Sequence, residues 1–331
     1  MPPPLLQTSD LKMHFPVKGG VIQRTKQWVK AVDGVDLAIN EGETLGLVGE
    51  SGCGKSTLGK CIVKLNTPTE GKINFRGHDL SGLSNRAMKP LRRDIQMIFQ
   101  DPVESLNARH TIGQILEEPF IIHGLGNATE RKRKVAELVE RVGLQQDVIA
   151  RYPFEFSGGQ RQRIGIARAI ALRPKFIVCD EPVSALDVSV QSQILNLLLD
   201  LQKDFGLTYL FIAHDLAVVK LISDRIAIMY LGKIVELGPA AEVFKNPLHA
   251  YTKALISAIP HPDPRKKSER IILQGDVPSP IDPPKGSAFA SRSWMPCPDE
   301  WKERPGKFIE VDPGHWVEVH PATFEDWQEY L

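Results

Sequence analysis

The segment at residues 49–57, GESGCGKST, constrains the fold of this 331-residue chain more than any other segment. It follows an apolar run at 44–48 that predicts a buried strand, and a helix is expected from Lys55 to about Leu65. The pattern G-x-x-x-x-G-K-[ST] between a strand and a helix is typical of a P-loop, which holds the phosphates of a nucleotide. A glycine-rich turn capping an ordinary helix is the alternative, and the full motif in this context disfavours it.

Each residue type in this loop has a physical reason to be there. The glycines allow backbone conformations that point successive N–H groups at phosphate oxygens, and the helix N-terminus adds the positive end of a dipole. Lys55 supplies a positive charge for the β- and γ-phosphates, while the Ser56 hydroxyl can bind Mg²⁺. The predicted nucleotide-binding residues are Gly49, Glu50, Ser51, Gly52, Cys53, Gly54, Lys55, Ser56 and Thr57.

Two adjacent carboxylates, Asp180 and Glu181, follow the apolar run at 176–179. A carboxylate at the tip of a buried parallel strand lies beside a phosphate loop in this class of fold. Asp180 suits Mg²⁺ coordination, and Glu181 can act as the general base for the attacking water. Two solvated turn residues are the alternative, and the P-loop upstream favours the functional interpretation.

The remaining pattern predicts an α/β fold with a parallel sheet. Apolar runs at 176–180 and 208–213 are typical of strands covered on both faces, and an apolar stripe between them predicts a crossover helix. Short strands at 11–17, 30–39 and 71–76 are expected to form an N-terminal antiparallel β subdomain, with an irregular basic insertion at 18–27 between the first two. We expect an ATPase domain at 1–260, with a helical subdomain at about 101–165, and an irregular C-terminal extension at 261–331.

Composition excludes several classes of function. Lysine plus arginine total 41 and aspartate plus glutamate 40, so no net field favours nucleic acid. The four cysteines are scattered without a CxxC pair, which is typical of a reducing compartment. The N-terminus lacks a signal-peptide pattern, and no apolar run approaches the roughly 20 residues of a spanning helix. Any membrane role is therefore expected to come through a partner.

Four further motifs follow the P-loop in order. They are IFQDP with Gln100, SGGQRQR at 157–163, SALD ending at Asp187, and FIAHD with His214. This set resembles the ABC ATPases over about residues 5–285. The stretches FQDPVESLN, RYPFEFSGGQRQRI and GDVPSPIDPP are similar to the ATPases of oligopeptide, dipeptide and nickel importers, with the strongest likeness to the dipeptide branch.

The resemblance implies roles for these residues. Such ATPases work in head-to-tail pairs, so the signature of one chain contacts the ATP held by its partner; the signature residues are Ser157, Gly158, Gly159 and Gln160. Glu181, His214 and Gln100 are implied as catalytic, Asp187 as nucleotide-contacting, and Ser56, Gln100 and Asp180 as Mg²⁺ ligands. Phe15 falls where the family stacks adenine, and a core phenylalanine on an edge strand is the alternative.

The resemblance also implies partners. They are a second ATPase, either a paralogue or another copy, two transmembrane permeases and an extracytoplasmic solute-binding protein. The chain would lie peripherally on the cytoplasmic face of the inner (plasma) membrane and power import of di- or oligopeptides or a related small solute. The alternatives are a soluble ABC protein acting on ribosomes or DNA, disfavoured by the single phosphate loop, and an exporter ATPase. The basic run 131–134 is interpreted as a solvated helix face.

The C-terminal extension departs from the family pattern. Many relatives carry four cysteines that ligate an iron–sulfur cluster, beginning with a pattern like GCxFxxRC, whereas this chain reads GSAFASRS at 286–293. Ser287 and Ser293 replace the first two cysteines, and only Cys297 follows. One thiol cannot hold a cluster that usually takes four. We therefore expect no iron–sulfur cluster, and an extension anchored by apolar packing of Trp294, Trp301, Trp316 and Trp327.

Overall fold

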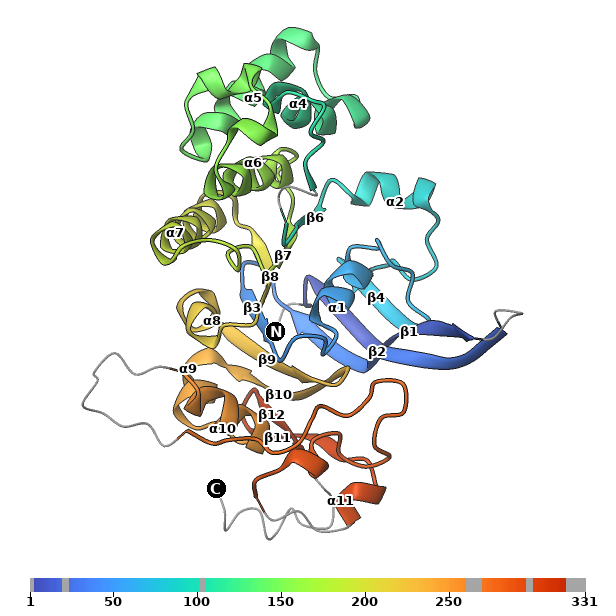
Figure 1. The fold of residues 1–331 in the computed structure, drawn as a ribbon. Coiled ribbons are helices and arrows are strands. Elements are labelled where there is room, and N and C mark those ends of the chain that lie inside the picture. The colour runs from blue at the N-terminus through green and yellow to red at the C-terminus, as the bar shows by residue number, and fades with distance from the viewer. Residues whose placement is uncertain (1–2, 20–23, 102–104, 260–269, 296–299, 320–331) are drawn as a thin grey trace, which may run out of the picture. The chain divides into compact units, whose positions relative to one another are not determined.

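The computed structural model describes residues 3–19, 24–101, 105–259, 270–295 and 300–319. The chain, drawn as a ribbon in Figure 1, divides into two compact units. Unit 1 comprises Met1–Ile39, Thr44–Gly82 and Ala213–Leu331, and unit 2 comprises Asn40–Glu43 and Leu83–Ile212. Over the described ranges, no helix combines the length and apolar character that crossing a membrane requires.

Unit 1 contains the expected N-terminal antiparallel sheet. Its strands are in the order β2-β1-β4-β5, with bounds β1 Leu6–Gly19, β2 Arg24–Ile39, β4 Glu70–Phe75 and β5 His78–Asp79. Residues 18–19 and 24–27 of the expected irregular insertion belong instead to β1 and β2, which remain paired as far as Gly19 and Arg24 (Figure 1), and residues 20–23 lie outside the described residues. Backbone hydrogen bonds hold such a ribbon together, and a side-chain pattern does not reveal them.

Unit 1 also contains five strands of a mixed sheet. Their order is β11-β12-β10-β9-β3, with bounds β3 Thr44–Val48, β9 Arg225–Tyr230, β10 Lys233–Pro239, β11 Lys307–Asp312 and β12 His315–Val319. Strand β3 is parallel to β9, whereas β10 pairs antiparallel with both β9 and β12. The helices of this unit are α1 Lys55–Ile62, α8 Leu216–Ile222, α9 Ala240–Lys245, α10 Ala250–Ser257 and α11 Glu300–Glu303.

The C-terminal extension therefore contributes a β-hairpin to this sheet, which the sequence pattern did not predict. Val317 and Val319 of β12 are buried against Leu248, with partly buried Ile309 and Val311 beside them. Strand β10 also carries the buried Glu236, which accepts hydrogen bonds from the Leu248 and His249 amides and lies 2.8 Å from Nε2 of His315. Apolar packing and these hydrogen bonds together tie the hairpin to the ATPase domain.

Unit 2 contains the parallel strands β6 Ile95–Ile98, β7 Phe176–Asp180 and β8 Thr208–Ala213, in the order β6-β7-β8. Every residue of β7 and β8 is buried, which confirms the two expected strands. The expected crossover helix is α7, Val188–Phe205, with Ile194, Leu198 and Leu201 among its buried residues.

The helices of unit 2, apart from α2 and the crossover helix α7, lie between β6 and β7 in the chain. The elements of this helical region are α2 Asn85–Leu91, α4 Ile112–Ile122, α5 Ala128–Arg141, η1 Gln146–Ala150, η2 Pro153–Glu155 and α6 Gly158–Ile170, with α2 preceding β6. Three helices begin with a capping box, in which the N-cap side chain and the N3 side chain each bond the other's backbone. These caps are Thr111, Asn127 and Ser157, so the signature motif forms a well-defined helix start.

Candidate functional site

The phosphate loop connects β3 to α1, as expected from the motif. Gly54 is the N-cap of α1 and has φ of 110°, a conformation that L side chains rarely adopt. A Cβ at Gly54 would also collide with the Ala31 carbonyl, and a Cβ at Gly49 would collide with the Met229 carbonyl. Both positions therefore require glycine, which gives the loop its close approach to the strands beneath it.

Lys55 is buried within this loop. Its side chain is 4% exposed, and Nζ donates to the Gly49 carbonyl at 2.7 Å and to the Glu50 carbonyl at 3.0 Å. Cys53 Sγ lies 3.8 Å from the same nitrogen; burial raises the pKa of that thiol, and the charge of Lys55 opposes the rise. The loop thus holds an ammonium group at the N-terminus of α1, surrounded by backbone.

These features fit the binding of a nucleoside triphosphate. Side chains at Gly49 and Gly54 would fill space at the loop, the helix start offers backbone N–H groups, and the ammonium of Lys55 offers positive charge. Ser56 and Thr57 follow on the first turn of α1 and are partly exposed. Among the described residues, no group of three or more His, Cys, Asp and Glu side chains could hold a metal ion. P-loop chemistry does not need such a group, because Mg²⁺ there takes a hydroxyl, a carboxylate and phosphate oxygens.

The two carboxylates lie at the end of β7 in unit 2. Asp180 is the last residue of the strand and is 3% exposed. Glu181 follows with φ of 43°, in the left-handed region, so the chain leaves the extended conformation of the strand there. Gln100, two residues after β6, donates from Nε2 to Oε2 of Glu181 at 3.0 Å. The structure thus joins two residues that sequence reasoning had assigned only separately.

The segment after Glu181 is held by its own hydrogen bonds. The Ser184 hydroxyl donates to the Glu181 carbonyl at 3.1 Å, and Gln191 Nε2 donates to the Val183 and Leu186 carbonyls. Asp187 is the N-cap of α7 without a side-chain capping bond, and it is exposed. Sequence reasoning missed Gln191, because its bonds back to the preceding loop have no signal in the local sequence pattern.

The signature motif begins helix α6. Ser157 Oγ accepts from the Gln160 amide at 3.4 Å, and Gln160 Oε1 accepts from the Ser157 amide at 3.1 Å. Ser157, Gly158 and Gln160 are exposed, and Gly159 is half-buried. A Cβ at Gly159 would lie 2.5 Å from Cγ1 of Val190, so α6 and α7 approach closely at this glycine. The motif therefore presents a helix N-terminus to solvent within unit 2.

Phe15 and His214 belong to unit 1. Phe15 lies on β1 opposite Val29 and is 37% exposed, so it is not a core residue. That exposure leaves a ring face available for stacking. His214 directly follows β8, is exposed, and precedes the N-cap of α8, where Asp215 accepts from the Ala217 amide.

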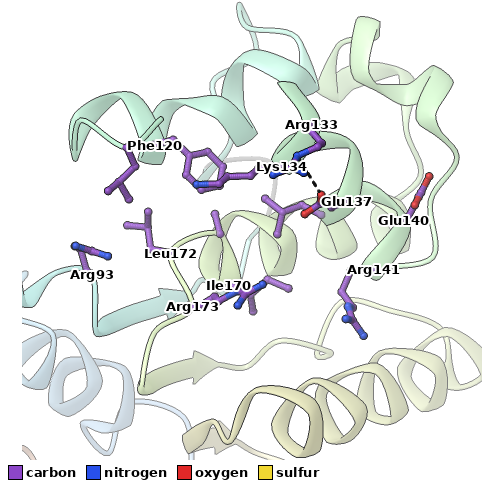
Figure 2. A pocket seen from close by; sticks show the side chains of 13 residues that line it. Arg93, Phe120, Arg133, Lys134, Glu137, Glu140, Arg141, Ile170, Leu172 and Arg173 are labelled. Atoms are coloured by element: carbon purple, nitrogen blue, oxygen red, sulfur yellow. Dashed lines mark ion pairs between the residues drawn. The ribbon is translucent and has the colours of Figure 1, made fainter. Parts of the chain in front are cut away.

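Unit 2 also contains a cavity of about 960 Å³ that includes none of the predicted site residues (Figure 2). Helices α4, α5 and α6 contribute to its lining, and its walls carry mixed charge. Arg133 pairs with Glu137 at 3.6 Å, and Lys134 lies over the ring of Phe120. Arg93 and Arg173 add further positive charge, so this cavity is lined by charged and apolar side chains, whereas Lys55 of the phosphate loop is surrounded by backbone.

Comparison with known proteins places the chain in a family. Residues 32–184 match the ABC transporter family, and residues 235–298 match the C-terminal region of oligopeptide/dipeptide transporters. An oligopeptide transport ATP-binding protein, AppF of Bacillus subtilis, is 53% identical over 96% of this chain and 97% of its own length. The dipeptide transport ATP-binding protein DppF of Haemophilus influenzae is 51% identical over 88% of this chain and 89% of its own.

Solved structures agree with this assignment. The ATP-binding cassette MJ0796, in a dimeric post-hydrolysis state bound to ADP and Pi, is 29% identical with a TM-score of 0.64. The match covers 71% of this chain and 98% of that cassette. The cassette cbiO1 of Clostridium perfringens, part of an ABC transporter complex, is 27% identical with a TM-score of 0.63 over 74% of this chain and 92% of its own length. From its motifs, its fold and its relatives, this chain belongs to the ATP-binding proteins of the oligopeptide and dipeptide branch of ABC transporters.

Proposed function

We propose that the chain binds and hydrolyses ATP with Mg²⁺ and that this reaction powers the import of di- or oligopeptides. The observation that carries the proposal is that one chain contains two different helix N-termini, each of which is suited to bind an anion. One is the phosphate loop with buried Lys55, and the other is the exposed signature at α6. Relatives of this chain that are 50% identical or more are named as peptide transport ATP-binding proteins, which supports peptides as the solute.

In the proposed mechanism, the phosphate loop and Lys55 hold the β- and γ-phosphates. Ser56, Asp180 and the amide oxygen of Gln100 would hold Mg²⁺, which when bound would neutralise charge on the phosphates. Glu181 accepts a proton from the attacking water, and its hydrogen bond from Gln100 orients the carboxylate. His214 contacts the γ-phosphate, and Phe15 stacks on the adenine.

A second ATPase chain completes each site in this proposal. The exposed Ser157, Gly158 and Gln160 would contact the γ-phosphate held by that second chain, with Asp187 near the same interface. Val188, beside Asp187, is 78% exposed, an apolar side chain that an interface would cover. ATP then joins the two chains and hydrolysis separates them, which supplies the two-state movement of the transporter.

The membrane partners are proposed to contact the helical region of unit 2. At the end of α4, Ile121 and Ile122 are 56% and 52% exposed, next to Phe120 of the cavity in Figure 2. Two permeases docked there would place the chain peripherally on the cytoplasmic face of the inner (plasma) membrane. An extracytoplasmic solute-binding protein would deliver the peptide to those permeases.

The basic run at 131–134 is not proposed to bind nucleic acid. Arg131 Nε bonds Glu117 at 2.8 Å, Arg133 pairs with Glu137, and Lys134 lies over Phe120. Three of its four cations thus have partners within α4 and α5. Phosphate binding by a basic patch depends on cations that are available to the backbone of a nucleic acid.

The function predicts hydrolysis that depends on pairing. Steady ATP hydrolysis with Mg²⁺ should rise more steeply than linearly with protein concentration, because each active site takes its signature from another chain. The measurement is phosphate release across a dilution series, with the mass of the particle followed by light scattering. If the partner is a paralogue, adding that chain should raise the rate at a fixed concentration. Equal specific activity in a demonstrably monomeric sample would contradict the proposal.

The extension is predicted to bind no iron. Ser287, at the place of the first cysteine, donates from Oγ to Glu318 of β12 at 3.4 Å, and Cys297 lies outside the described residues. Trp294 Nε1 donates to the Ala250 carbonyl, and Trp316 stacks on Phe308, whereas the side chains of Trp301 and Trp327 also lie outside that description. Anaerobic purification followed by iron analysis and visible absorbance should find no stoichiometric iron. A charge-transfer band with stoichiometric iron would overturn the prediction, and Cys297→Ser would then test whether this chain supplies a ligand.

A further inference from the structure

A charged pair connects the C-terminal extension to the phosphate loop. Arg292 lies at the end of the short 3₁₀ helix η3, Ala290–Arg292, and its side chain is 9% exposed. Its guanidinium donates two hydrogen bonds to the Glu50 carboxylate, from Nη1 to Oε2 at 2.8 Å and from Nη2 to Oε1 at 3.3 Å. The two residues are 242 positions apart in the chain. Two parallel bonds to one carboxylate fix direction as well as distance.

The segment that carries Arg292 is itself firmly packed. Phe289 is 2% exposed and touches the rings of Tyr230, Tyr251 and His249 at centroid distances of 5.3 to 5.5 Å. Arg292 Nη1 also lies 3.4 Å from the Tyr230 hydroxyl. The buried ring of Phe289 anchors the backbone that carries Arg292, and the planar guanidinium loses less entropy per hydrogen bond than a flexible ammonium would, so both favour the bond to Glu50.

Glu50 is the second residue of the phosphate loop and is held at three points. Its amide donates to the Tyr251 hydroxyl at 2.9 Å, its carbonyl accepts from Lys55 Nζ, and its carboxylate accepts from Arg292. Tyr251 in turn packs against Phe289 and Tyr230. Two of these three contacts therefore depend on groups from, or packed against, the C-terminal extension.

A carboxylate in a loop that binds triphosphate opposes that binding unless a cation balances it. Among the hydrogen bonds of the described residues, the guanidinium of Arg292 is the cationic group that bonds the Glu50 carboxylate. Within the described residues, Nε of Arg292 is buried without a hydrogen-bond partner. The cost of burying this guanidinium is therefore offset mainly by its contacts with Glu50 and Tyr230. The two charges thus depend on each other, and breaking the pair would leave one of them uncompensated.

We propose that Arg292 is a positioning residue for nucleotide binding, which acts through Glu50 to hold the phosphate loop and to balance its negative charge. The inference rests on the proposed ATP binding at this loop. It assigns the C-terminal extension a role in the nucleotide site of its own chain, because the extension supplies the cation and the aromatic anchor beneath the loop. In this role Arg292 acts through Glu50 and is not a catalytic residue.

The test is a double-mutant cycle on the full chain, with the affinity for Mg²⁺–ATP measured by titration calorimetry. Arg292→Ala should weaken binding about tenfold, a change of roughly 1.4 kcal/mol, since it leaves the Glu50 carboxylate unpaired beside the phosphates. Making the same change in a Glu50→Gln background should weaken binding much less, to within about threefold, because no unpaired charge then remains. Arg304→Ala, an exposed arginine of the same extension, is the matched control and should leave affinity unchanged.

Thermal unfolding of each variant separates loss of fold from loss of positioning. Should Arg292→Ala prove unfolded, Arg292→Lys takes its place in the cycle. This variant keeps the charge but cannot make two parallel hydrogen bonds to the carboxylate, so it should weaken binding severalfold. Equal affinity for the Arg292 and Arg304 variants, or the same fold-change in both Glu50 backgrounds, would overturn the inference. A parent chain that binds no ATP would instead refute the proposed function, so the two failures are distinguishable.

Discussion

Replacing Glu181 by glutamine should lower the turnover number for ATP hydrolysis at least about 100-fold while leaving ATP bound, because only the general base is lost. The substitution keeps the shape of the side chain, and an amide oxygen can accept the same hydrogen bond from Gln100. The strained backbone at this residue, with φ of 43°, is held by the Glu181 amide bonding the Ile212 carbonyl and does not depend on the carboxylate. The variant should therefore accumulate as an ATP-bound pair of chains.

Single-turnover hydrolysis and the mass of the particle in the presence of ATP check this expectation. Glu140→Gln, on the exposed face of α5, is the matched control and should behave as the parent does. A Glu181→Gln protein that turned over ATP at the parent rate would show that another group takes the proton. Loss of both binding and turnover would show instead that the carboxylate has a structural role in unit 2.

Replacing Lys55 by alanine should weaken the binding of ATP by about 100-fold or more. A hydrogen bond to a charged group contributes about 1.5–3 kcal/mol, and the ammonium offers three donors to the phosphates. In the structure these donors bond the Gly49 and Glu50 carbonyls, so the variant also loses two contacts that shape the loop.

Equilibrium binding of Mg²⁺–ATP, with thermal unfolding alongside, measures the effect. Lys60→Ala is the matched control, since Lys60 lies in the last turn of the same helix and outside the phosphate loop. Lys55→Arg should also bind poorly, because a planar guanidinium does not fit the space that a compact ammonium occupies among the loop carbonyls. Parent-like affinity in Lys55→Ala would place the phosphates elsewhere on the chain.

The sequence by itself determined the nucleotide chemistry of this protein and its fold class. The phosphate loop spans nine consecutive residues, 49–57, and the conformation of such a segment depends mainly on its own glycines and on the strand and helix beside it. The buried strands at 176–180 and 208–213 and the helix between them were likewise evident, because a strand covered on both faces must be apolar throughout. The comparisons with relatives confirm the family that these motifs indicated.

Only the tertiary structure decided how distant segments meet. Gln100 bonds Glu181 across 81 positions and Arg292 bonds Glu50 across 242, and neither pairing leaves a trace in local sequence pattern. The hairpin of β11 and β12 also escaped prediction, because its short strands are recognisable only from their pairing with β10. Local motifs state which groups can do the chemistry, whereas contacts between remote residues depend on the packing of the whole unit, and that packing is what holds the phosphate loop against the C-terminal extension.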